Sequence, residues 1–170
     1  METEVNKQRQ ATMSLSNATF FALLEQELIE HGSVRIRVKG ISMEPMLRNN
    51  RDEVQILPYD GRELTAKDIC LFRFQGRHVL HRFLCREGSM CYFRGDNVLA
   101  RCECCDQTDV VGVVRTIYRD GLPIPPYSEE WQHKIERHRF KQRIRFSLTS
   151  HLPTGLKHLL KQVLGMKKTN

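Results

Sequence analysis

VRIRVKGISMEPML, residues 34–47, marks the point at which the chain changes its pattern. Up to Lys39, apolar and basic residues alternate, as on a β-strand with one buried face. Gly40 ends the alternation, and a single small hydroxyl, Ser42, then stands before a Met-Glu-Pro-Met cluster. Because Gly, Ser and Pro are common in turns, Ser42 can be a turn residue only. It can also be a nucleophile whose peptide substrate lies along the preceding strand.

The pattern on either side predicts one helix followed by a compact β domain. Ser16 or Asn17 can cap an amphipathic helix that ends before Gly32. Short strands are expected at Val34–Val38, Glu53–Leu57, Ile69–Phe74, Val79–Leu84, Cys91–Phe93 and Val110–Tyr118. The proline-rich residues 121–126 then close the domain. We therefore expect an N-terminal tail and helix (1–33), a mainly β, mostly antiparallel domain (34–126) and a basic C-terminal extension (127–170).

The C-terminal extension carries the excess of positive charge. Residues 1–126 hold 17 Lys+Arg and 17 Asp+Glu, whereas residues 127–170 hold 10 and 3, which gives the net +7 of the whole chain. A basic tail on a neutral body favours an anionic membrane surface or, less so, nucleic acid; a solvated surface is an equal alternative. Residues 131–148 fit a strand and a helix equally. Residues 156–164 predict an amphipathic helix, either packed on the core or lying on a membrane.

Several absences indicate a cytoplasmic protein, with peripheral attachment to the inner membrane surface as an option. The first ten residues lack the apolar stretch of a secretory signal, and the longest apolar run, residues 20–24, is too short to span a membrane. The six cysteines follow no paired C-x-x-C spacing, which favours reduced thiols. Cys102, Cys104 and Cys105 would need a further ligand to hold a metal. We expect neither a cofactor nor a metal.

A nucleophilic serine needs a base, and the base needs a group that orients it. No lysine occurs between residues 67 and 134, which excludes a serine–lysine pair on the central strands. His78 and His81 are an odd number of residues apart on one expected strand, so only one can share a face with Ser42. Asp96 follows a glycine after the next strand and is by default a turn residue. One hairpin from His81, it could instead orient the imidazole.

Five stretches occur in a set order: GISMEPML (40–47), DICLF (68–72), VLHR (79–82), RGDN (94–97) and VGVV (111–114). Together they resemble the motif set of type I signal peptidases and LexA-type self-cleaving repressors. The resemblance implies an all-β peptidase fold in which Ser42 attacks a substrate that adds as a strand beside residues 34–39. It also implies His81 as the base, as in the endoplasmic-reticulum and archaeal-type branch, Asp96 as that branch's Gly-Asp residue, and small residues beside the cleaved bond.

Two local features differ from the family pattern. Gly40 stands where bacterial members often have a serine that helps bind the oxyanion, so this role would fall to backbone N–H groups, including that of Ser42. Arg51 and Lys67 stand where a glycine commonly precedes the aspartate in two turns, and the Asn49-Asn50 pair can supply one left-handed conformation. The changes at Arg51 and Lys67 concern loops and not the chemistry.

The sequence therefore predicts a cytoplasmic serine endopeptidase that processes a peptide or protein, such as a leader peptide, with Ser42, His81 and Asp96 as its catalytic residues. One alternative is a self-cleaving regulator, which would need an Ala-Gly or Cys-Gly bond that the sequence lacks. The other is a non-catalytic binding module whose tail binds lipid or nucleic acid. Such a module would need none of the three residues.

Overall fold

The computed structural model describes residues 17–126 and 128–150 of the chain. Its elements are α1 (Asn17–His31), β1 (Val34–Arg37), β2 (Glu53–Pro58), β3 (Ile69–Phe74), β4 (Arg77–Glu87), β5 (Met90–Arg94), β6 (Glu103–Asp106), the 3-10 turn η1 (Gln107–Asp109), β7 (Val110–Arg119), β8 (Leu122–Ile124) and α2 (Glu129–Ser150). The predicted N-terminal helix and all the predicted strands are confirmed, with ends that differ by three residues or fewer.

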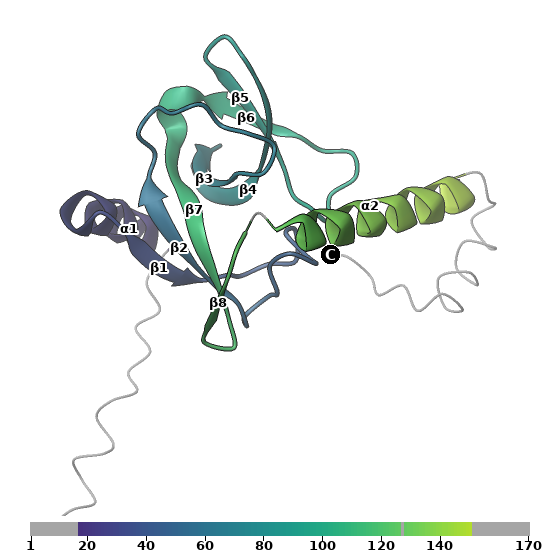
Figure 1. The fold of residues 1–170 in the computed structure, drawn as a ribbon. Helices are drawn as coiled ribbons and strands as arrows, with labels where there is room; N and C mark the ends of the chain where they lie inside the picture. The colour runs from purple at the N-terminus through teal and green to yellow at the C-terminus, as the bar shows by residue number, and fades with distance from the viewer. Residues whose placement is uncertain (1–16, 127, 151–170) are drawn as a thin grey trace, which may run out of the picture.

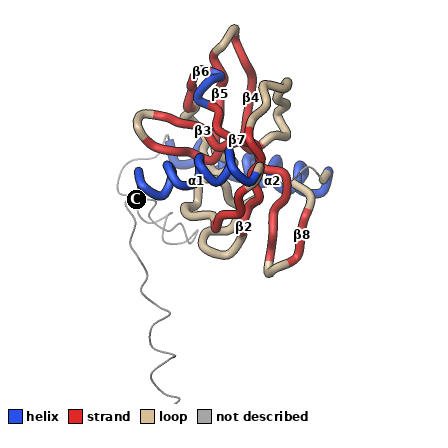
Figure 2. The backbone as a smooth tube through the Cα atoms, turned by 90° about the vertical axis from the view of Figure 1, so that its left-hand side faces the viewer, coloured by secondary structure: helices blue, strands red, loops and turns tan. Residues whose placement is uncertain are grey.

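The strands of the described residues form one curled antiparallel sheet, so the mainly β fold class is confirmed (Figures 1 and 2). Their order is β1-β2-β7-β3-β4-β5-β6, and β8 adds to β7. The short strands β6 and β8 were not predicted. The proline-rich segment thus contributes a strand before it leaves the sheet, and Pro123 fits there because β8 pairs with β7 alone.

Two apolar clusters hold the sheet together. One contains Met43 and Met46, which are 2% and 0% exposed, so the turn that carries Ser42 is anchored in the core. Leu24 and Leu28 of α1 pack into the same cluster. The second cluster includes the stacked rings of Phe72 of β3 and Phe93 of β5, the two strands that flank β4. Packing of the Met43 and Met46 side chains into the first cluster therefore fixes the turn around Ser42.

The ambiguous segment at residues 131–148 is helical and forms part of α2 (Figure 1). Ile135 joins the core cluster at 2% exposure, and this contact fixes the first half of the helix against the sheet. The helix predicted at residues 156–164 lies outside the described residues. Among the residues that are described, neither helix is both long and apolar enough to cross a membrane.

A buried carboxylate, Asp52, ties the segment after Ser42 to β7. Asp52 is fully buried and accepts hydrogen bonds from the Arg48 backbone at 2.9 Å and from the Arg119 guanidinium at 2.6 Å. Burial pushes the pKa of Asp52 upward, but the hydrogen bonds from Arg119 and Arg48 outweigh it and hold this pKa below its ordinary value. Beside it, Asn50 has a φ of 57°, the left-handed conformation expected for this pair.

Asp52→Asn should lower the free energy of unfolding by about 2–3 kcal/mol near neutral pH, because two arginines lose their buried charged partner. Since the folded pKa lies below the unfolded value of about 3.9, the carboxylate's contribution is complete above that value and is lost as the pH falls through the folded pKa. Urea unfolding at several pH values should therefore show that the difference in the free energy of unfolding between the wild-type protein and Asp52→Asn becomes smaller in acid. Glu63→Gln, at an exposed carboxylate, is the control. A difference in the free energy of unfolding that grows in acid would contradict the role of Asp52 as an ionised partner of the two arginines.

Candidate active site

The structure brings Ser42 and His81 into contact across a sequence separation of 39 residues. Ser42 Oγ lies 2.9 Å from His81 Nε2. Ser42 follows β1 and is partly exposed, whereas His81, in the middle of β4, is 6% exposed. His78 bonds instead to Glu25 of α1 at 2.6 Å and stacks on Phe21. The expectation that only one of the two histidines reaches the serine is confirmed.

Glu103 of β6 completes the group on the far side of the imidazole. Its Oε2 lies 2.9 Å from His81 Nδ1, and the two side chains are only 18% and 7% exposed. An ionised carboxylate can only accept a hydrogen bond, so the ring hydrogen belongs on Nδ1. Nε2 is then left with a lone pair that faces the Ser42 hydroxyl. This is the tautomer that a histidine needs in order to take a proton from a serine.

Asp96 does not occupy the orienting position that the sequence led us to expect. It is fully buried and receives two hydrogen bonds of 2.8 Å from the Arg82 guanidinium, and Arg139 of α2 adds a third at 2.9 Å. Arg82 also donates to the Lys67 carbonyl at 2.9 Å. Asp96 thus holds the turn after β5, and the contact with the ring falls to Glu103.

Glu103 was missed because it lies on a strand that the pattern did not predict. The sequence Glu-Cys-Cys-Asp carries no run of apolar β-formers, yet β6 pairs with β5 and sets Glu103 opposite Phe93. The alternation of burial along Glu103, Cys104 and Cys105 is visible only in the structure, because positions 104 and 105 are both cysteine in the sequence. Only the pairing of the strands brings the carboxylate to the imidazole.

The turn that carries Ser42 is held by its backbone. The Gly40 N–H donates to Asn49 Oδ1 at 2.9 Å, and Gly40 has a φ of 97°, which favours glycine. Gly95 closes over the site from the β5 side. A side chain there would place its Cβ 2.5 Å from the Ser42 carbonyl and 3.1 Å from His81 Nε2. Within the described chain, no hydrogen bond engages the Ser42 N–H, so this group can donate to an oxyanion.

The cysteines form no comparable site. Cys105 is buried, while Cys104, its neighbour on β6, is exposed, so the two lie on opposite faces and cannot converge with Cys102 on one ion. Burial raises the pKa of Cys105 to about 12, and it also raises the pKa of Cys70 and Cys91, which leaves these thiols protonated and unreactive. In the described part of the chain, no three His, Cys, Asp or Glu side chains gather as a metal site requires.

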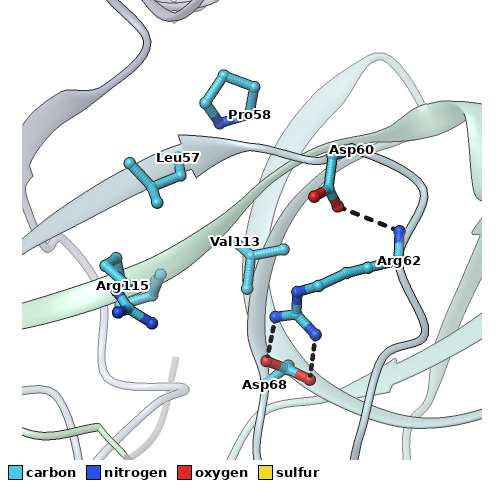
Figure 3. Close-up of a pocket in the computed structure, with 8 residues that line it drawn as sticks. Leu57, Pro58, Asp60, Arg62, Asp68, Val113 and Arg115 are labelled. Carbon is cyan, nitrogen blue, oxygen red and sulfur yellow. Dashed lines mark hydrogen bonds and ion pairs between the residues drawn. The ribbon is translucent and has the colours of Figure 1, made fainter.

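A shallow pocket of about 200 Å³ lies elsewhere on the molecule (Figure 3). It is lined by Leu57, Pro58, Asp60, Arg62, Asp68, Val113, Val114 and Arg115. The Arg62 guanidinium faces the Asp68 carboxylate across it, with a shortest N–O distance of 2.7 Å. Burial alone would raise the pKa of Asp68, but hydrogen bonds from Arg62 and Thr65 outweigh this effect and hold the pKa below its ordinary value. The pocket contains none of the residues around Ser42.

No family model matches the chain, and no curated protein matches it either. A hydroxyl, an imidazole and a carboxylate in hydrogen-bonded series can generate a serine nucleophile at neutral pH.

Glu103→Ala should change the tautomer of His81, because Nδ1–H loses its acceptor. In the wild-type protein, nitrogen NMR of ¹⁵N-labelled histidine should report hydrogen on Nδ1, and the variant should report a mixture of tautomers. Asp96→Asn should leave the tautomer of His81 in the folded protein unchanged, because Glu103 still accepts from Nδ1, while it lowers the stability of the protein by removing the charged partner of Arg82. If the tautomer of His81 stays the same after Glu103→Ala, or if Asp96→Asn also produces a mixture of tautomers, Glu103 is not the group that orients the ring.

Proposed function

We propose that this protein is a serine endopeptidase of the signal-peptidase type. The observation that carries the proposal is the series Ser42–His81–Glu103, with 2.9 Å at each of its two contacts. His81 Nε2 takes the Ser42 proton as Oγ bonds to the scissile carbonyl carbon, and the imidazolium then gives that proton to the leaving amine. Water releases the acyl group by the same route in reverse. Glu103 holds the ring and stabilises its cation in both steps.

The open edge of β1 supports binding of the substrate as an extended strand. Among the described strands, β1 pairs with β2 alone, and the chain runs from its end directly into the turn of Ser42. A peptide that adds to this edge gains main-chain hydrogen bonds and is led toward the nucleophile. The free Ser42 N–H supplies one donor for the oxyanion. Small residues beside the scissile bond follow from the resemblance to signal peptidases.

The surface of α2 supports attachment to an anionic membrane. Phe140 and Ile144, one helical turn apart, are 64% and 43% exposed. Arg137 and Lys141 are exposed on the same helix. Apolar side chains beside cationic ones suit the boundary between lipid headgroups and acyl chains. These exposed side chains support peripheral attachment through α2; that the membrane is the inner, cytoplasmic surface and that the substrates are leader peptides remain part of the proposal.

The test is mass spectrometry of a library of leader-derived and proteome-derived peptides incubated with the purified protein, with and without anionic vesicles. The wild-type protein should cut a subset of peptides beside small residues, and vesicles should raise the rate. Ser42→Ala and His81→Ala should lose at least about 10³-fold in rate, and Glu103→Ala roughly 10²–10⁴-fold. Ser89→Ala, at the serine of the β4–β5 turn, is the matched control and should retain activity.

Cuts that persist in Ser42→Ala would show that another nucleophile or a contaminant is responsible. If no peptide is cut with or without vesicles, while the protein still binds the vesicles, the result would favour the non-catalytic binding module. Cleavage at one bond within the chain itself would favour the self-cleaving regulator.

A further inference from the structure

Asn97, in the turn after β5, hydrogen-bonds to the backbone carbonyls of both Ile41 and Ser42. Its N–H donates to the Ser42 carbonyl at 2.8 Å, and its Nδ2 donates to the Ile41 carbonyl at 3.1 Å. Gly95, two residues earlier, lies so close to the same carbonyl that a Cβ would overlap with it. The turn at residues 95–97 therefore fixes where the Ser42 backbone, and with it Oγ, lies relative to His81.

The other end of the Asn97 side chain is held by α2. Its Oδ1 accepts a hydrogen bond from the Gln142 amide and lies 2.9 Å from His138 Nε2. Gln142 Nε2 also lies 2.9 Å from His138 Nε2, and one ring nitrogen cannot both donate to Asn97 and accept from Gln142. If His138 carries hydrogen on Nε2, it donates to Asn97; if it does not, it accepts from Gln142. The hydrogen bond from Gln142 to Asn97 forms with either tautomer.

These contacts give the Asn97 amide a single useful orientation. Its oxygen faces donors on α2, and its NH₂ group faces the Ile41 carbonyl, so each end meets the complementary group. The same face of α2 carries Arg139, which bonds to Asp96 at 2.9 Å. Residues 138, 139 and 142 thus join α2 to the two residues that follow Gly95. They are partly buried, so these polar contacts form where water is largely displaced.

We propose that α2 positions the catalytic serine, with Asn97 as the positioning residue that couples the helix to the Ser42 turn. This inference rests on the proposed peptidase function and adds a positioning helix to it. Through its contacts with α2, the Asn97 side chain is held where its amide donates to the Ile41 carbonyl, beside the backbone bond to the Ser42 carbonyl. Loss of the α2 contacts would leave all the catalytic residues present but would disturb the geometry of the nucleophile. A small displacement is sufficient, since misplacement by about 1 Å can cost on the order of 10²-fold in rate.

The experiment compares Asn97→Ala, Asn97→Asp and the double variant H138A/Q142A with the wild-type protein. The control is His133→Ala, at an exposed histidine of the same helix. Two quantities are measured: kcat and KM on a peptide that the wild-type protein cuts, and hydrogen–deuterium exchange of fragments covering residues 40–47. Exchange in β3, residues 69–74, reports whether the whole domain has loosened.

Asn97→Ala should lower kcat roughly 10–100-fold with KM changed by less than about two-fold, and should speed exchange at residues 40–47 but not in β3. Asn97→Asp keeps the acceptor for α2 but sets a carboxylate oxygen against the Ile41 carbonyl, so it should lower kcat as well. H138A/Q142A should speed exchange of the same turn, although neither residue contacts Ser42. His133→Ala should match the wild-type protein.

If Asn97→Ala has the same kcat as the wild-type protein and the same exchange rate at residues 40–47, the positioning role of Asn97 is overturned. Wild-type exchange at residues 40–47 in H138A/Q142A would overturn the part assigned to α2, and this variant decides the matter if Asn97→Ala does not fold. If the wild-type protein cuts no peptide, the peptidase proposal fails on its own, whereas the exchange measurements still decide whether α2 holds the turn.

Discussion

The buried ion pair between Asp96 and Arg82 is the interaction on which the site depends. Both side chains are almost completely withdrawn from water, at 0% and 2% exposure, and two hydrogen bonds of 2.8 Å join them. Arg82 adjoins His81 on β4, and Asp96 adjoins Asn97, which holds the Ser42 carbonyl. The pair therefore fixes the base and the nucleophile relative to each other. Removing one partner of such a buried pair costs about 3–5 kcal/mol, because the other charge is left uncompensated.

Two carboxylates divide the work that sequence reasoning gave to one. Asp96 follows a recognisable glycine in RGDN and was expected to orient the imidazole, yet the buried Arg82 and the partly buried Arg139 hold it in a structural role. Glu103 orients His81 from a strand that has no clear pattern of its own. Ser42 could be noted from its place after a strand, and strand periodicity showed that only one of His78 and His81 could reach it; the choice of His81 came from the resemblance to signal peptidases. The carboxylate could not be found in these ways, because its position depends on how β6 pairs with β5 and not on its neighbours in sequence.

The C-terminal extension illustrates a second limit of the pattern. Residues 131–148 fitted both periodicities because their apolar positions serve different surroundings. Ile135 packs into the core, while Phe140 and Ile144 are exposed. His138 and Gln142 are polar yet partly buried, because their partner is the side chain of Asn97. A helix that packs through hydrogen bonds as well as apolar contacts carries a weak hydrophobic stripe, and its role can be read only from the tertiary structure.

Activation of the Ser42 hydroxyl by His81 can be tested without knowledge of the peptide substrate. The folded protein is incubated with a small activated ester such as p-nitrophenyl acetate, and the acetylated residues are mapped and timed by mass spectrometry. The account predicts that Ser42 is acetylated faster than any other serine, and that His81→Ala reduces its rate to that of an ordinary surface serine. Acetylation of Ser42 at equal rates in the wild-type protein and in His81→Ala would contradict it.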